Sequence, residues 1–368
     1  MIGLALAAAL AGEVVMSQRA EPITLRAQPA ADRAAIERDY KQLSFSPGAD
    51  RPAAMGFSLI VPKDWAAVPG AAPAPTGETP VRIIGQVRPR AAPDGDVAEI
   101  VVAAMRLERE VAPADALAAY LDAKGGYRVR ETRRFPTSYG AVADLVADAG
   151  GGRAGGAGAG AERHSRLIAT KDGPFVYVLE ASVAEDAARA GAYDDAFALA
   201  VTGFTLTDPT RARFAEPFDW RAVGPGARAV VPDAWTPVSL PTGPDEAVGA
   251  AAQSATGASI AFAGTDDPEA LKRVATALIA ALPKGVGTPK LDADSAPVVL
   301  DSGAPGWTLA RYRSERAGVA LSVVTATKDG LGVVMVSPGP RAQEGVWAHA
   351  RRVMDVALET FGPAPRQP

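Results

Sequence analysis

The 368-residue chain contains no cysteine, only two histidines, and few aromatic residues, which make up 6% of the sequence. The absence of cysteine excludes disulfides, cysteine-ligated zinc, iron–sulfur clusters and thiol nucleophiles. The two histidines, His164 and His349, are too few for a histidine-rich metal site or for a relay of several imidazoles. The sequence therefore predicts no cofactor and no metal, and it predicts cores built mainly from aliphatic side chains.

The chain also lacks a strong excess of charge of either sign. Its formal net charge is −4, from 38 Lys and Arg against 42 Asp and Glu, and the two signs are interspersed. A protein that binds nucleic acid needs a basic face to neutralise the phosphate backbone. Nucleic acid is therefore not expected among the partners of this protein.

Long apolar runs are missing as well, and the most apolar short run is Ile2–Ala11. This run is about half as long as the roughly 20 residues that a membrane-spanning helix needs. Its Ala9-Leu10-Ala11 end is typical of a signal-peptide cleavage site, although no positive charge precedes the apolar residues. We expect a signal peptide within residues 1–19; the alternative is an Ala-rich helix with no targeting role. No transmembrane segment is expected after it, and peripheral association with the cell envelope stays open.

An internal repeat indicates two diverged copies of one domain in tandem, which suits a length that exceeds one ordinary core. The motif V-P-x-x-W occurs at 61–65 and at 231–235, 170 positions apart (235 − 65). The pentapeptide A-T-K-D-G occurs at 169–173 and at 326–330, 157 positions apart (326 − 169). A β-rich run follows each pentapeptide, and each copy then ends in a helix whose last aromatic residue shows the same spacing of 157.

Both copies show the same order of periodic segments. A strand leads into the Trp motif, one or two strands follow, and a helix then begins with proline in its first turn. Three further strands run through the A-T-K-D-G turn, where Asp-Gly is a strong hairpin signal, and a terminal helix closes the copy. Adjacent strands joined by tight turns predict an α+β fold. We therefore expect two tandem α/β/α or two-layer sandwiches, each a mainly antiparallel sheet covered by helices.

The predicted boundaries follow from the repeat and from proline-rich segments. An N-terminal extension at 20–54 carries one amphipathic candidate helix, Ala30–Leu43. The predicted helices of the two copies are Pro113–Lys124 and Pro268–Leu282 near the middle, with Phe204 and Phe361 at the ends of the terminal helices. The predicted division of the chain is 1–19 leader, 20–54 extension, 55–207 first domain, 208–226 linker, 227–362 second domain and 363–368 tail.

Several residues invite a catalytic interpretation, but each has a simpler structural one. The glycine-rich run 150–160 matches neither a phosphate-binding P-loop nor a dinucleotide-binding motif, and it is interpreted as a hairpin insertion of the first copy. His164 and His349 are not equivalent in the repeat, and we expect a surface or half-buried, hydrogen-bonded role for each. The acidic pairs Asp194-Asp195 and Glu185-Asp186 are interpreted as helix-start and solvated charges. No catalytic residue is predicted.

Two tryptophans are the candidate anchors of binding or structure. Trp65 and Trp235 follow a proline at the end of the first strand in each copy. Packing that caps the sheet edge is the favoured interpretation, and a binding groove shared by both copies is the alternative.

The segment Gly56–Trp65, together with the element order of each half, resembles the PsbP-like superfamily, which includes Mog-type Ran-binding factors and DcrB-like bacterial proteins. The resemblance covers 55–207 and 227–362. It implies an α/β/α sandwich that acts by binding or assembly, usually without catalysis. No family binding residue matches well enough to be carried over.

Together these features predict a non-catalytic, exported binding or assembly factor of the bacterial cell envelope, periplasmic or secreted, with a protein partner. One alternative is a cytosolic chaperone or adaptor for a secreted or membrane-associated client. A more remote alternative is an enzyme with an unrecognised site.

Overall fold

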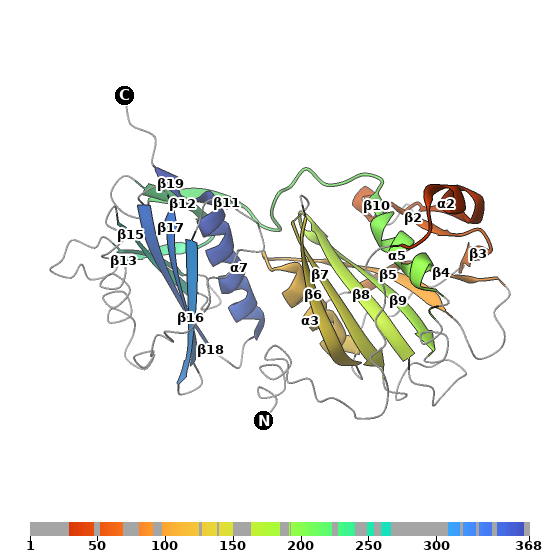
Figure 1. Cartoon of the computed structure of the whole chain (residues 1–368). Helices are drawn as coiled ribbons and strands as arrows, with labels where there is room; N and C mark the ends of the chain where they lie inside the picture. The colour runs from red at the N-terminus through yellow and green to blue at the C-terminus, as the bar shows by residue number, and fades with distance from the viewer. Residues whose placement is uncertain are drawn as a thin grey trace. The chain divides into compact units, whose positions relative to one another are not determined.

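A computed structural model of the chain divides it into two compact units, which are described separately (Figure 1). The N-terminal unit comprises Ile2–Leu107 and Pro113–Arg213. The C-terminal unit comprises Phe214–Pro368 together with Glu108–Ala112, which lies earlier in the sequence. The structure describes residues 29–47, 52–68, 81–90, 98–124, 127–137, 140–149, 163–184, 191, 193–222, 227–239, 249–253, 259–265, 308–316, 319–328, 331–340 and 344–363.

The N-terminal unit contains a three-stranded and a seven-stranded sheet, in the orders β1-β2-β10 and β3-β4-β5-β9-β8-β7-β6, and its pairings are antiparallel. The elements are α2 (Arg33–Asp39), β1 (Tyr40–Phe45), a 3-10 turn (Ala53–Met55), β2 (Phe57–Pro62), β3 (Trp65–Ala67), β4 (Val81–Pro89), β5 (Glu99–Arg106), α3 (Pro113–Lys124), β6 (Tyr127–Thr137), β7 (Gly140–Ala149), β8 (Arg163–Asp172), β9 (Phe175–Ala184), α5 (Asp194–Thr202) and β10 (Thr205–Leu206).

The two faces of the seven-stranded sheet have different coverings, because successive side chains of a strand point to opposite faces. One face contributes alternate residues of β5 and β9 to an aromatic-rich core with β2 and α5. The other face lies under α3, whose Leu117 and Tyr120 are buried. Figure 1 shows α3 on one side of this sheet, and α5 with β2 and β10 on the other.

The C-terminal unit has two antiparallel sheets, in the orders β11-β12-β19 and β13-β14-β15-β18-β17-β16. In the first, β12 lies between its partners as β2 does in the N-terminal unit. The six strands of the second follow the order of β3-β4-β5-β9-β8-β7, strand for strand. The elements are β11 (Phe218–Ala222), β12 (Ala227–Pro232), β13 (Thr236–Ser239), β14 (Gly249–Gln253), β15 (Ser259–Thr265), β16 (Thr308–Arg316), β17 (Val319–Lys328), β18 (Leu331–Pro340), α7 (Glu344–Thr360) and β19 (Gly362–Pro363).

The core of the C-terminal unit lies between α7 and the strands that it covers. Val353, Ala357 and Leu358 of α7 are fully buried, and Ala229 and Val231 of β12 are fully buried too. Figure 1 shows α7 lying along its sheet. Both units are thus antiparallel sheets packed with helices, which confirms the predicted α+β class.

The first predicted helix is only half right. Arg33–Asp39 forms α2, with the Asp32 side chain accepting a hydrogen bond from the Ala35 N–H at 2.8 Å as an N-cap. The predicted helical residues Tyr40–Leu43 instead begin β1, which pairs with β2. No residue of α2 is buried, so the helix has no packing to extend it, whereas the strand gains ladder hydrogen bonds and half-buried side chains.

Both A-T-K-D-G segments lie at hairpins, β8–β9 and β17–β18. In the first, Asp172 still pairs with Phe175, so Gly173 and Pro174 form the turn in place of Asp-Gly. Gly173 has a φ of +54°, and a Cβ there would lie 2.5 Å from Cγ2 of Thr210. Backbone conformation and close packing both explain glycine at this position.

Other predicted segments can now be located. The helix predicted from Pro113 to Lys124 is α3, without a shift at either end. Four strands follow it and not three, because β6, whose apolar alternation is weak, pairs along the edge of the sheet with β7. The predicted linker 208–226 includes β11. The leader, the glycine run 150–160 and the helix predicted at 268–282 lie outside the described residues.

Candidate functional site

Trp65 lies at the centre of the aromatic core of the N-terminal unit. Only 1% of it is exposed, and its ring meets the ring of Tyr193 edge-on at 5.9 Å. The turn before it is tied to β1, because Lys41 Nζ donates to the carbonyls of Lys63 and Trp65 at 2.7 and 2.6 Å. Its indole therefore packs inside the unit.

Trp235 is buried in the same way, with 3% exposed, but its neighbour is polar. The indole meets the ring of His349 on α7 edge-on at 5.4 Å. His349 Nε2 lies 2.6 Å from Glu216 Oε1, and only 1% of this histidine is exposed. Trp235 therefore packs against His349, which is itself paired with Glu216.

The same helix, α7, also takes part in a cluster of charged side chains inside the C-terminal unit. Arg352 Nε donates to Glu110 Oε1 at 3.2 Å, and Arg352 Nη1 donates to Glu359 Oε1 at 2.9 Å. Glu110 is fully buried and also accepts from the backbone N–H of Ala215 at 2.8 Å. Burial lowers the pKa of Arg352, but the carboxylates of Glu359 and Glu110 outweigh it and raise the pKa above its usual value. These hydrogen bonds fix the charged groups of Arg352, Glu110 and Glu359 within the unit.

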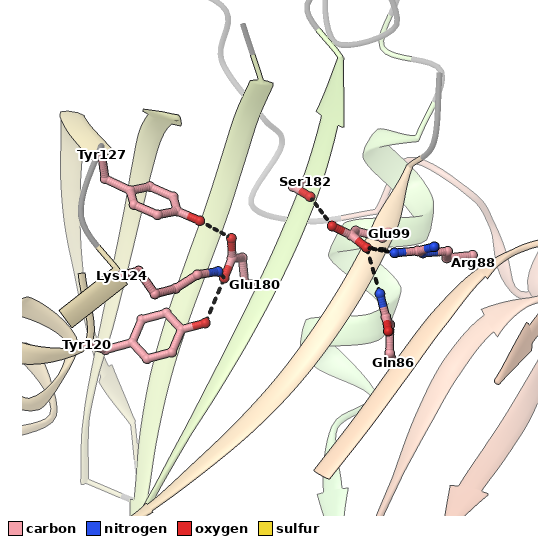
Figure 2. A network of polar contacts seen from close by, with 8 residues as sticks. All are labelled: Gln86, Arg88, Glu99, Tyr120, Lys124, Tyr127, Glu180 and Ser182. Atoms are coloured by element: carbon pink, nitrogen blue, oxygen red, sulfur yellow. Dashed lines mark hydrogen bonds and ion pairs between the residues drawn. The ribbon is translucent and has the colours of Figure 1, made fainter. Parts of the chain in front are cut away.

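The face of the N-terminal sheet under α3 carries a second polar network, drawn in Figure 2. Its centre is Glu180 on β9, which is 4% exposed. Tyr120 Oη and Lys124 Nζ donate to Oε2 at 2.7 and 2.6 Å, and the Tyr127 hydroxyl donates to Oε1. Because the donors come from both ends of the α3–β6 connection, Glu180 ties the helix and the strand to the sheet.

The surroundings of Tyr120 keep its hydroxyl protonated. Burial raises its pKa well above the usual value of 10.0, and the neighbouring charge of Glu180 adds to the shift. A phenol that stays protonated remains a hydrogen-bond donor to the carboxylate. Tyr120 therefore remains a hydrogen-bond donor to Glu180 through neutral and mildly alkaline pH.

Glu99 on β5 is the second carboxylate on this face. Its Oε2 accepts from Gln86 Nε2 at 2.8 Å and from Arg88 Nη2 at 2.8 Å, and its Oε1 accepts from Ser182 Oγ at 3.4 Å (Figure 2). The Arg88 side chain is 43% exposed, so this part of the network reaches solvent. Both carboxylates are thus engaged with several donors, which is an arrangement that supports structure.

The outer face of β11 and β12 carries an uncovered aromatic side chain. Trp220 on β11 is 44% exposed, the one large hydrophobic side chain that is exposed among the described residues. Its partner in the ladder is Val230, and Arg228 lies two residues before Val230 on the same face. The Arg228 Cζ atom lies 4.0 Å from the centroid of the Trp220 ring, a cation–π contact.

The residues around Trp220 extend this surface and define its charge. Phe214 and Phe218 are half-buried, and their ring centroids lie 4.5 Å apart. Arg221 donates to Asp219 at 2.8 Å and lies 3.5 Å from Asp233, so the charge of Arg221 is balanced within these strands. We call the set Phe218, Trp220, Ala222, Arg228 and Val230 the β11–β12 face.

The sequence-predicted candidates end up in different places. Trp65 and Trp235 lie in separate units, each buried. The expectation of surface or half-buried histidines is wrong: His164 is fully buried on β8, an interior strand, and His349 lies on the packed side of α7. Asp194 and Asp195 do lie in the first turn of α5, and Asp195 accepts from the Ala30 N–H at 2.7 Å, but Asp194 is buried, so the solvated interpretation is wrong for it. Glu185 and Asp186 lie outside the described residues.

Sequence reasoning missed the two polar networks and the β11–β12 face. Glu180 is the one charged residue in β9, FVYVLEASVA, and a charge inside an apolar strand run signals a buried partner. Trp220 falls within the predicted linker, where a tryptophan among polar residues was a usable signal. Within the ranges that the structure describes, no group of three or more His, Asp or Glu side chains could hold a metal ion, and no helix there is long and apolar enough to cross a membrane.

No protein-family model matches the chain, and no curated protein matches it. Among solved structures, it is similar to cyanobacterial PsbP from Synechocystis sp. PCC 6803, with 13% identity and a TM-score of 0.33 over 46% of this chain and 92% of that one. It is also similar to LpqN of Mycobacterium tuberculosis, described as involved in cell envelope biogenesis, with 16% identity and a TM-score of 0.29 over 49% of this chain and 99% of that one.

A weaker likeness is to MucB in complex with MucA(peri), with 14% identity and a TM-score of 0.17 over 76% of this chain and 88% of that one. All of these TM-scores are low. The function of the chain is therefore inferred from its own contacts.

Proposed function

We propose that the chain is a non-catalytic binding or assembly factor of the bacterial cell envelope, and that it holds a partner protein on the β11–β12 face. The observation that carries this proposal is the exposed indole of Trp220, lying beneath the Arg228 guanidinium on an outer strand. Tryptophan and arginine are the side chains most enriched among the residues that dominate protein–protein binding energy. A partner that covers this exposed aromatic ring removes its apolar surface from water, which favours binding.

The buried carboxylates support binding over acid–base chemistry. Glu180 accepts from two tyrosines and a lysine, and Glu110 accepts from Arg352 and from a backbone N–H. A general acid or base must instead offer a proton-transfer position toward a substrate. The hydrogen bonds of Glu180 hold α3 and β6 to the sheet, and those of Glu110 hold α7 to the segment before β11.

We further propose that the two units are diverged copies of one domain. The two strand orders support this, since β13-β14-β15-β18-β17-β16 repeats β3-β4-β5-β9-β8-β7. The ladder also supports it, because Trp220 pairs with Val230 as Gln42 pairs with Ile60, each one residue before the valine of V-P-x-x-W. On this view Trp220 is an acquisition of one copy, since its counterpart Gln42 bonds Ser58 within the fold.

The binding proposal is tested by affinity capture from the envelope fraction of the native host, with wild-type protein and the variant Trp220→Gln side by side. Gln is the residue that the other unit carries at this position, so the substitution keeps a strand compatible with the fold. We expect a defined set of proteins that wild type retains and the variant loses. The matched control is Gln42→Ala, which leaves the captured set unchanged; equal capture by wild type and Trp220→Gln would refute the proposal.

Export is proposed from the apolar run Ile2–Ala11 and its small-residue end. Mass spectrometry of the mature N-terminus in fractionated host cells tests it. A chain that starts near Gly12 in the envelope fraction supports export. An intact Met1 in the cytosolic fraction overturns it in favour of a cytosolic chaperone or adaptor.

A further inference from the structure

We propose that the β11–β12 face recognises an acidic segment of its partner protein, with a partner carboxylate bound by the guanidinium of Arg228. This inference rests on the proposed function, and it names the chemistry of the partner at the same surface. The juxtaposition that carries it is a cation stacked on an exposed indole, with small residues on both sides.

Among the described residues, Arg228 has no carboxylate partner. No hydrogen bond or ion pair joins it to any residue among those described; its contact is the 4.0 Å stacking on Trp220. The other arginine of these strands, Arg221, is held by Asp219 and Asp233. An arginine that lies over an indole, without an anion among the described residues, is available to a ligand.

Stacking prepares Arg228 for a carboxylate. A guanidinium that lies on an aromatic ring keeps its N–H edge free, and that edge matches the two oxygens of a carboxylate. The ring also restricts the long side chain, so less conformational entropy is lost when the ligand binds. Its ladder partners are Ala222 on β11 and Gly362 on β19, which place no bulky side chain beside it.

The partner is expected to dock on the face of the sheet and not on its edge. At the edge, the backbone N–H of Trp220 already donates to Asp219 Oδ1 at 2.8 Å. A charged side chain that occupies an edge N–H is a common protection against strand addition. The face, in contrast, offers the exposed indole and the Arg228 guanidinium together.

The charge around the face favours a protein over a membrane or a nucleic acid. Asp219 and Asp233 are paired with Arg221, which leaves Arg228 as the cation of this face among the described residues, and the chain has a net charge of −4. Anionic lipid surfaces and nucleic acids attract clusters of basic residues. A single arginine over a tryptophan can instead bind one carboxylate of a partner protein, while the indole contacts an apolar side chain next to that carboxylate.

The test uses the full chain and three labelled heptapeptides in fluorescence anisotropy at low salt. Each peptide alternates Thr with a second residue, which is Glu in the probe and Gln or Lys in the controls. We expect the Glu peptide to bind about tenfold more tightly than the Gln peptide, the ratio that about 1.4 kcal/mol gives. The Lys peptide should bind most weakly, and added salt should reduce the Glu preference.

Two variants assign the effect to the stacked pair. Arg228→Lys keeps the charge but loses the planar fork, so the preference for Glu over Gln should fall several-fold. Trp220→Gln should weaken the binding of both the Glu and the Gln peptide, because it removes the shared apolar contact, and should also reduce the preference for Glu, because Arg228 loses the ring that orients it. The control Lys41→Gln lies in the other unit and should leave all three affinities unchanged.

Three results would overturn the inference. They are equal affinity for the Glu and Gln peptides, an unchanged Glu preference in Arg228→Lys, and binding of phosphatidylglycerol vesicles without binding of the Glu peptide. Failure here is distinguishable from failure of the proposed function. If Trp220→Gln still loses captured proteins while the Glu preference is absent, the protein-binding face stands and only its acidic specificity is wrong.

Discussion

The two units place a tryptophan at the same point of the same strand order, but they surround it with different chemistry. Trp65 packs against Tyr193 in an aromatic core, whereas Trp235 packs against His349, which is paired with Glu216. The half-buried Arg352 then links Glu110 and Glu359 on the side of α7. The difference teaches that strand order sets where the indole lies, while the residues on the covering helix decide what it touches.

The first strands of the two sheets differ in a second way. At equivalent ladder positions, β1 carries Lys41 and Gln42, and β11 carries Asp219 and Trp220. Lys41 and Gln42 satisfy groups within the N-terminal unit. Trp220 satisfies none and stays exposed. The position of Gln42 therefore serves folding in the N-terminal unit, whereas the side chain at the equivalent position in the C-terminal unit, Trp220, is exposed, and we propose that it serves recognition.

The largest expected effect is the loss of a repeated tryptophan. Trp65→Ala should lower the free energy of unfolding of the N-terminal unit by about 3–5 kcal/mol, because it removes a fully buried aromatic side chain. Urea unfolding followed by circular dichroism measures the loss, and hydrogen–deuterium exchange locates it in β2, β3 and α5.

Trp235→Ala is the counterpart, and its faster exchange should appear in β12 and α7. If either substitution raised exchange equally in both units, the comparison of two separate cores would be wrong. Trp220→Ala, which removes an exposed indole, is the control, and it should leave the exchange in both cores unchanged.

A smaller effect is expected from the buried carboxylates. Glu180→Ala leaves a buried tyrosine hydroxyl without its acceptor and should cost about 1–3 kcal/mol, with faster exchange in α3. Glu110→Ala should act instead on α7. Glu99→Ala, whose partner Arg88 reaches solvent, should cost less than about 1 kcal/mol. If Glu180→Ala and Glu99→Ala lowered the free energy of unfolding equally, the idea that the more buried carboxylate contributes more to stability would be wrong.

The next effect concerns alkaline pH. The pKa of Tyr120 is raised in the folded state above its usual value of 10.0. The stabilisation is fully present below pH 10 and is lost as the pH rises from there toward the folded pKa, by up to about 1.4 kcal/mol per pH unit. Tyr120→Phe should therefore lose less stability between pH 9 and 11 than wild type does, as measured by urea titrations. A parallel decline in both proteins would contradict the raised pKa.

The smallest effect on stability is expected on the β11–β12 face. Trp220→Gln should change the free energy of unfolding by no more than about 0.5 kcal/mol while it reduces binding. The converse substitution, Gln42→Trp, tests whether the N-terminal unit accepts the same surface. A large loss of stability in Trp220→Gln would mean that Trp220 serves the fold, and the contrast between β1 and β11 would then disappear.

Local patterns were sufficient where the structure is governed by local geometry. Proline in the first turn and helical periodicity located α3 from Pro113 to Lys124. Alternation located β12 without error, and the A-T-K-D-G segments located both hairpins. The same reasoning overextended the helix at Tyr40–Leu43, because pairing with β2, a contact distant in sequence, decides for a strand there.

The candidate site was beyond the reach of such patterns. Glu180 meets Tyr120 and Tyr127, which are 60 and 53 positions away in the sequence. Trp220 and Arg228 are brought together only by the register of β11 on β12. Neither pairing leaves a periodic signal, since each depends on which strands become neighbours.

The sequence by itself determined the α+β class, the position of the repeated tryptophans, and the absence of cysteine chemistry. These follow from residue composition and from periodicities of two and 3.6 residues, which are local properties. The tertiary structure alone decided that His164 and His349 are buried, that Glu180 ties α3 and β6 to the sheet, that Glu110 bonds Arg352 of α7, and that Trp220 is exposed beneath Arg228. These depend on burial and on long-range contacts, which exist only once the sheets have assembled.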